Sequence, residues 1–132
     1  MRDSKYKSVL LIDDSYIDNL INRKILENSQ FADDVIVMDS PVRAIDYLNK
    51  CFDKQALPEI IFLDIRMPEM NGFEFLQKLR EISSGDDGHE LKIYVLSSSL
   101  DPSDLRRVEG NNLVTKFIGK PLTVRVLDEI KE

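Results

Sequence analysis

The chain has 132 residues, of which 42% are hydrophobic and 32% charged, a composition typical of one globular domain with a buried core. Its net charge of −6 argues against nonspecific nucleic-acid binding, which requires clustered lysine and arginine. The single cysteine excludes an intramolecular disulfide, and neither a membrane-spanning run of roughly 20 apolar residues nor a signal-peptide core is found, so a cytoplasmic location is expected.

The first half of the chain alternates between two patterns. Apolar runs rich in β-branched residues predict strands buried on both faces, and apolar residues three or four apart predict helices. Ser15 with Asp18, and Ser40 with Pro41, are typical helix starts. The predicted elements are a strand over Ser8–Ile12, a helix from Ser15 to about Ser29, a strand over Asp34–Met38, a helix from Ser40 to Phe52, a loop over Asp53–Pro58, and a strand over Ile60–Asp64.

The second half repeats this alternation. Gly72 opens a helix, and Asp101 followed by Pro102 supplies another capping residue before a proline. The last strand is less apolar than the others, which is typical of the edge of a sheet. The predicted elements are a helix over Gly72–Ile82, a loop over Ser83–Glu90, a strand over Leu91–Leu96, a helix over Asp101–Glu109, a strand over Leu113–Ile118, and a helix over Thr123–Glu132.

Five strand–helix units in succession predict an α/β fold. Right-handed crossovers would build a doubly wound, five-stranded parallel sheet with helices on both faces. Residues 1–132 are expected to form a single domain, because no longer repeat, low-complexity segment or linker interrupts the pattern. Two reactive side chains fall outside any motif: Cys51 is expected to be buried on a helix, and His89 to be solvated in a loop.

Chemically distinctive side chains stand where the strands end. Asp13 and Asp14 follow the first strand, Asp64 ends the third, Ser97 follows the fourth and Lys120 the fifth. Ligands bind at the carboxyl edge of open parallel sheets, so these groups are expected to converge. Each residue alone is equally well explained as an ordinary turn or capping residue. Five such coincidences at successive strand ends favour a functional site.

The chemistry of this set points to a phosphoryl group. Clustered carboxylates repel one another, and a bound cation reverses that penalty. Oxygen ligands of this kind suit Mg²⁺, with Mn²⁺ as an alternative. Lys120 and Ser97 add a positive charge and a hydroxyl donor, which phosphoryl oxygens require. With no cysteine or histidine nearby, Asp64 is predicted to be the nucleophile and to form an aspartyl phosphate.

Four segments together resemble the receiver domain of the two-component response-regulator family, over nearly the whole chain. The resemblance implies a flavodoxin-like receiver fold with strand order 2-1-3-4-5. It also implies a stand-alone phosphorelay switch, not an enzyme, to which a sensor histidine kinase or histidine phosphotransfer protein passes a phosphoryl group. The matching segments are Leu11–Asp14, Leu63–Pro68 with Asn71-Gly72, Leu96–Ser98, and Phe117–Pro121.

The resemblance assigns a metal site and a phosphoacceptor. Asp64 would accept the phosphoryl group. Asp14, Asp64 and the backbone carbonyl of Arg66 would bind Mg²⁺ directly, and Asp13 would act through water.

The resemblance also assigns residues around the phosphoryl group. Lys120 would pair with it, next to a cis Lys120–Pro121 bond. Ser97 would move toward it, and Phe117, where tyrosine is usual, would rotate inward. Arg66 and Ser99 occupy positions that tune the lifetime of the phosphoryl group.

Partners are expected to be proteins, with no nucleic acid and no membrane. The switch surface would comprise the fourth helix, fifth strand and fifth helix and would bind a downstream target. Four residues of the first helix either dock the phosphodonor or pack in the core, and the sequence leaves both open. They are Tyr16, Ile17, Leu20 and Ile21.

Two rival functions remain to be distinguished from the switch. An aspartate-nucleophile phosphohydrolase would resemble the chain at Asp64, but it needs a second aspartate where Arg66 stands. A receiver-like scaffold that takes no phosphate is disfavoured by the intact set of acidic, hydroxyl and lysine residues. Failure to phosphorylate would support the scaffold.

Overall fold

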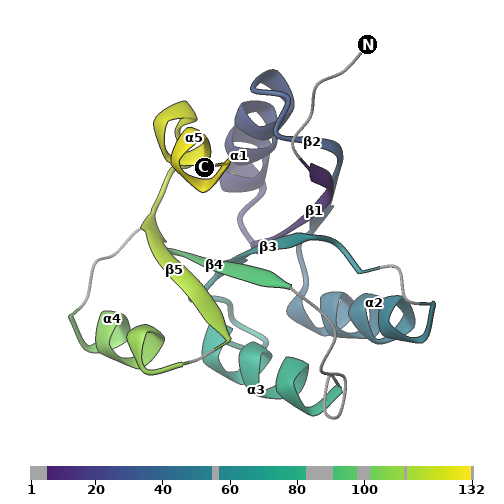
Figure 1. Ribbon diagram of the computed structural model, residues 1–132. Helices are drawn as coiled ribbons and strands as arrows, with labels where there is room; N and C mark the ends of the chain where they lie inside the picture. The colour runs from purple at the N-terminus through teal and green to yellow at the C-terminus, as the bar shows by residue number, and fades with distance from the viewer. Residues whose placement is uncertain (1–5, 55–56, 83–90, 98–101, 112, 132) are drawn as a thin grey trace.

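Five parallel strands in the order β2-β1-β3-β4-β5 form the centre of the computed structural model. The structure describes residues 6–54, 57–82, 91–97, 102–111 and 113–131. In Figure 1, α1 and α5 cover one face of the sheet, and α2, α3 and α4 cover the other. The elements are β1 (Tyr6–Ile12), α1 (Tyr16–Asn28), β2 (Ala32–Met38), α2 (Pro41–Lys54), β3 (Ile60–Asp64), α3 (Gly72–Ile82), β4 (Lys92–Ser97), α4 (Pro102–Glu109), β5 (Val114–Gly119) and α5 (Val124–Lys131).

The predicted fold class, strand order and alternation of elements are confirmed, with small differences at element ends. The first two strands begin two residues early because Tyr6 pairs with Ala32, and its N–H donates to the Phe31 carbonyl oxygen at 3.1 Å. The predicted loop from Asp53 is wrong at its start, since α2 continues to Lys54. No glycine or proline stands between Pro41 and that residue to stop the helix.

The structure also tests the expectations for the edge strand and for Cys51. β5 lies at an edge of the sheet, as its composition predicted. Cys51 is buried, also as predicted. The loop over 83–90 with His89, together with Ser98 and Ser99, lies outside the described residues. Among the helices that the structure describes, none combines the length and hydropathy needed to cross a membrane.

The central strands β1 and β3 are buried on both faces because successive side chains point to opposite sides. Leu11 and Phe62 lie in the core cluster that includes Leu127 of α5. Leu10 and Leu63 lie in the second cluster, against α2 and α3. This two-sided core explains why the strands read as continuous apolar runs.

The strand register brings the carboxyl ends of β1, β3, β4 and β5 to one edge of the sheet. Ile12 pairs with Leu63, Leu96 with Asp64, and Ser97 with Gly119. Residues that follow these pairs therefore emerge side by side, which is the placement that the site requires.

Candidate functional site

Three carboxylates converge at this edge of the sheet. Asp13 and Asp14 follow β1, and Asp64 ends the neighbouring β3. One ligand oxygen of each lies within 4.8 Å of the others. Asp13 and Asp64 are buried, whereas Asp14 is exposed. The expected convergence of the three carboxylates required β1 and β3 to be neighbours in the sheet, and they are.

Lys120 reaches into this acidic cluster from the end of β5. Its Nζ lies 2.6 Å from Asp13, 2.9 Å from Asp18 and 3.3 Å from Asp64. Its backbone N–H donates to the Ser97 carbonyl oxygen at 2.9 Å, and the Lys120–Pro121 bond is cis, as the resemblance implied. The Lys120 ammonium, on a side chain that is only 8% exposed, thus faces three carboxylates.

Charge and burial set the protonation of these groups. Burial, the largest effect, and the nearby charge of Asp13 together raise the pKa of Asp64 to about 6, while Lys120 and the Arg66 backbone N–H oppose the shift. Burial by itself lowers the pKa of Lys120, but hydrogen bonds to Asp13 and Asp18 outweigh it and leave that pKa above its ordinary value. Lys120 therefore stays charged, and Asp64 is protonated more readily than an ordinary aspartate.

Without metal, the Asp64 carboxyl should make the fold less stable as the pH rises. Its pKa is 3.8 in the absence of a fold and about 6 in the folded chain, so the folded state binds more protons between these values. Relative to Asp64→Asn, we expect the free energy of unfolding of the wild type to fall by about 1–3 kcal/mol across this window.

Denaturant unfolding of both proteins in EDTA, from about pH 4 to about pH 7, measures this difference. Because asparagine does not titrate, it isolates the contribution of one carboxyl. A difference that stays constant with pH would contradict the raised pKa.

Local hydrogen bonds hold Asp13 in place. The Ser15 N–H donates to Asp13 Oδ1 at 2.9 Å, and Asn19 Nδ2 donates to the Asp13 carbonyl oxygen at 2.7 Å. Ser15 Oγ in turn accepts from the Asp18 N–H, as the capping-box pattern predicted. Sequence reasoning missed the second role of Asp18, its pairing with Lys120. No sequence signal links two residues so far apart in the chain.

The turn after β3 is equally constrained. Gly72 donates its N–H to the Ile65 carbonyl oxygen at 2.7 Å. A Cβ at Gly72 would lie 2.8 Å from Ile65 Cα, so any side chain there displaces the backbone next to Asp64. Asn71 and Glu74 cap α3 reciprocally through their side chains. The Asn71-Gly72 pair thus fixes the exit of the chain from the site.

The remaining predicted residues lie around the acidic cluster. Ser97 is buried at the end of β4. Phe117 is half-buried and packs with Val95 and Val108 beneath α4. Arg66 directs its guanidinium to Asp104 of α4, a partner that the sequence did not indicate. Ser99 lies outside the described residues.

The donor set suits Mg²⁺ or a similar hard cation. The carboxylates offer oxygen ligands only, in the small number that Mg²⁺ accepts while keeping several waters. The charge of Asp13 contributes to the raised pKa of Asp64, and a divalent cation would neutralise that repulsion. Asp13, Asp14 and Asp64 are the residues that could hold it.

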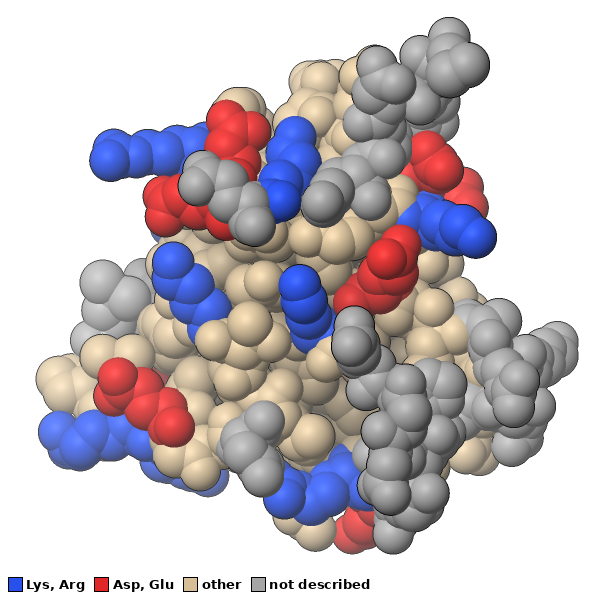
Figure 2. All heavy atoms as spheres, in the orientation of Figure 1, with Lys and Arg blue, Asp and Glu red and all other residues tan. Residues whose placement is uncertain are grey.

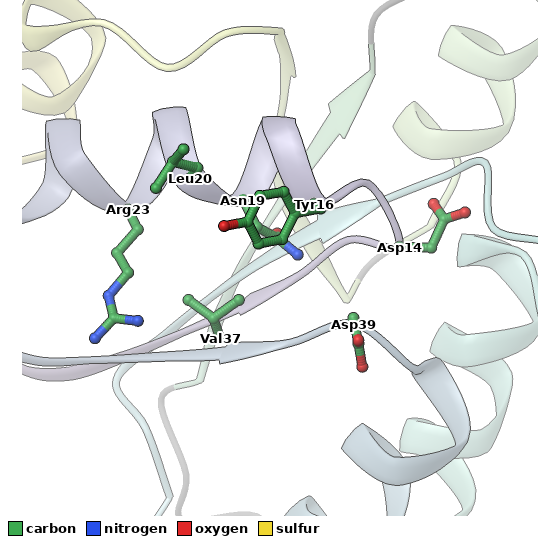
Figure 3. A pocket seen from close by; sticks show the side chains of 7 residues that line it. All are labelled: Asp14, Tyr16, Asn19, Leu20, Arg23, Val37 and Asp39. Carbon is green, nitrogen blue, oxygen red and sulfur yellow. The ribbon is translucent and has the colours of Figure 1, made fainter.

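A cavity of about 440 Å³ adjoins the cluster between α1 and β2. Figure 3 shows Arg23 at one end and Asp14 with Asp39 at the other. Its remaining lining residues are Tyr16, Asn19, Leu20 and Val37.

The apolar residues at the start of α1 are exposed, which contradicts the core-packing interpretation that the sequence left open. Their exposed fractions rule out core packing as their main role. They are Tyr16 at 79%, Ile17 at 65%, Leu20 at 44% and Ile21 at 43%. We call these four residues the α1 ridge.

Comparison with known proteins agrees with this geometry. The family model of the response regulator receiver domain matches residues 9–131. The crystal structure of a two-component response regulator from Cytophaga hutchinsonii has a TM-score of 0.86 and 34% identity, covering 95% of this chain and 93% of that one. A response regulator receiver protein from Dyadobacter fermentans has a TM-score of 0.79 and 28% identity, with 94% of each chain covered.

Curated relatives extend the similarity to other lineages. The two-component response regulator ORR1 of Oryza sativa subsp. indica is 30% identical over 94% of this chain, which spans 53% of that protein's length. The probable methanogenesis regulatory protein FilR2 of Methanothrix harundinacea is 27% identical over 94% of this chain and 81% of its own length. The chain thus spans about half the length of the rice relative.

Proposed function

The chain belongs to the response regulator receiver domain family, whose members are signalling modules, and from that premise we propose that it is a phosphorylation switch. Asp64 accepts a phosphoryl group from a phosphohistidine of a sensor histidine kinase or a histidine phosphotransfer protein. The observation that carries the proposal is Lys120 Nζ, held within 3.3 Å of Asp64 and 2.6 Å of Asp13 at the sheet edge. An ammonium at this position would neutralise the oxygens of a phosphoryl group on Asp64, which supports the proposal.

The transfer step needs little covalent chemistry from the protein. A carboxylate oxygen of Asp64 attacks phosphorus, the P–N bond to histidine breaks, and its electron pair stays on the imidazole nitrogen. Lys120 holds a charged ammonium toward the incoming oxygens, and Ser97 lies nearby to donate its hydroxyl. Arg66 and Ser99 tune the lifetime of the product, and Phe117 moves inward as the surface changes.

Receiver domains bind Mg²⁺ in an acidic pocket, and the cluster here fits that ion. Asp14, Asp64 and the Arg66 carbonyl oxygen would bind it, with Asp13 acting through water. When bound, the cation neutralises phosphoryl oxygens and lowers the cost of bringing a dianion to a carboxylate.

Partner binding is assigned to two surfaces. The α1 ridge, next to the acidic cluster, offers exposed apolar area for the phosphodonor. The face of α4, β5 and α5, with Leu105 and Val124 exposed, would bind a downstream protein. On the face in Figure 2, the described basic side chains are dispersed among other residues, which favours protein partners over nucleic acid. We further propose that the chain acts as one receiver domain in the cytoplasm.

A phosphohydrolase is the weaker alternative. Such an enzyme requires a second carboxyl two residues after the nucleophile as its general acid. Arg66 stands at that position, and a guanidinium does not release a proton in proteins. Turnover of a phosphate ester by the purified chain would favour the phosphohydrolase.

Intact-mass spectrometry after incubation with acetyl phosphate or phosphoramidate tests the switch. We expect one phosphoryl adduct in Mg²⁺ and a loss of adduct in EDTA, because the crowded carboxylates then repel the donor. Reversal of the EDTA effect by added Mg²⁺ is the control for intact protein. No adduct under any condition would contradict the proposal and favour the scaffold.

A further inference from the structure

Contacts from three kinds of side chain fasten α4 to the body of the protein. Arg66 Nη2 donates to Asp104 Oδ2, and the Asp104 side chain is only 7% exposed although it lies in the first turn of a surface helix. The Arg107 guanidinium lies 3.7 Å from the centre of the Phe73 ring. Val108 is buried beneath the helix. The ion pair holds the start of α4, and the other two contacts hold its second half.

Arg66 connects α4 to the acceptor carboxyl. Its backbone N–H is hydrogen-bonded to Asp64, two residues earlier in the chain. Its side chain is 60% exposed and reaches Asp104 of α4. One residue therefore contacts both the phosphorylation site and the helix that changes in the proposed switch.

We propose that Arg66 and Asp104 form a charge-sensitive latch, an inference that rests on the proposed function of Asp64. In the unphosphorylated chain, the Asp104 carboxylate keeps the Arg66 guanidinium on α4. A phosphoryl group on Asp64 brings about −1.5 to −2 charges and three acceptor oxygens, against one charge on a carboxylate. Guanidinium binds phosphate with two parallel hydrogen bonds, so Arg66 turns back toward Asp64 and releases α4.

Because Asp104 is buried, loss of its contact with Arg66 should change the start of α4. A buried carboxylate that loses its cationic partner is strongly unfavourable, so Asp104 must turn toward water. Because it lies in the first turn of α4, that turn opens with it. The contacts of Arg107 and Val108 are independent of Arg66 and keep the rest of the helix packed. Asp104 is thus a positioning residue for Arg66, and the change is confined to the start of α4.

A purely structural role for Asp104 makes a different prediction. Acidic side chains in a first turn stabilise a helix through its dipole, whatever happens at Asp64. Loss of Asp104 would then loosen α4 equally in phosphorylated and unphosphorylated protein. The latch instead predicts that phosphorylation and loss of Asp104 have the same effect and do not add.

Hydrogen exchange of α4 peptides, measured by mass spectrometry with and without acetyl phosphate and Mg²⁺, distinguishes the two roles. In the wild type, we expect phosphorylation to raise exchange roughly tenfold at the α4 amides that hydrogen-bond to the carbonyl oxygens of the first turn. In Asp104→Asn, exchange should already be raised without phosphate, and phosphorylation should add less than about twofold. Asp128→Asn, which removes an exposed acidic partner of Lys131 on α5, is the matched control and should behave as wild type.

Arg66→Gln removes the exposed partner of the ion pair and should also abolish the effect of phosphorylation on α4 exchange. This variant keeps the test decisive if Asp104→Asn folds poorly. A wild-type adduct that leaves α4 exchange unchanged overturns the latch alone. So does a phosphorylation response of equal size in the wild type and both variants. Absence of any adduct on the wild type overturns the proposed function and the latch with it.

Discussion

The Asp64→Asn variant should acquire no phosphoryl group from acetyl phosphate or phosphoramidate in Mg²⁺, whereas the wild type acquires one. The amide is nearly the same size as the carboxylate, but its oxygen is a poor nucleophile and brings no charge to the metal. Asp64 is buried at the end of β3, and asparagine fills the same space, so the change should leave the fold intact. Intact-mass spectrometry reads the loss directly.

Asp39→Asn provides the matched control for this experiment. Asp39 is an exposed carboxylate just after β2 and is not part of the acidic cluster, so the same chemical change there should leave the adduct in place. Retention of a full adduct on Asp64→Asn would show that another residue is the acceptor. Peptide mapping of that adduct would then identify it.

Lys120→Met should lower the free energy of unfolding by about 3–5 kcal/mol, the usual cost of removing one partner from a buried ion pair. Methionine keeps most of the apolar stem but leaves the fully buried Asp13 without its cation. Asp64, whose pKa is already raised, also loses the charge that opposes this shift. Denaturant unfolding in EDTA measures the loss.

Lys116→Met is the matched control, because Lys116 lies on β5, four residues before Lys120, and pairs with Glu129 at 3.9 Å on the surface. Removal of an exposed pair should cost less than about 1 kcal/mol. Mg²⁺ should stabilise Lys120→Met more than it stabilises the wild type, since the metal would replace the missing positive charge. Equal losses in the two variants would contradict the importance of the buried cation.

Local chemistry made most of the elements predictable. The capping pair Ser15 and Asp18 forms the expected hydrogen bond, and β5 lies at the edge of the sheet, as its polarity indicated. The element ends depend on more than local chemistry. Tyr6 belongs to β1 through pairing with Ala32, a contact between strands that no local pattern encodes.

The candidate site was predictable because strand ends are visible in the sequence. Once five parallel strands are inferred, the residues that follow them must meet at one edge of the sheet. This inference identified the candidate residues Asp13, Asp14, Asp64, Ser97 and Lys120. The strand order came from the resemblance and not from periodicity. Periodicity alone does not show that β1 lies next to β3, and therefore does not show that Asp13 lies close to Asp64.

The sequence by itself determined the α/β class, the places of the strands and helices, and the chemistry available at the sheet edge. Each of these depends on spacing over a few residues, which local sterics and burial control. Only the tertiary structure decided that the α1 ridge faces solvent, that Asp18 pairs with Lys120, and that Arg66 holds Asp104. These contacts join residues 38 and 102 positions apart in the two ion pairs, so they depend on strand register and helix packing across the whole chain.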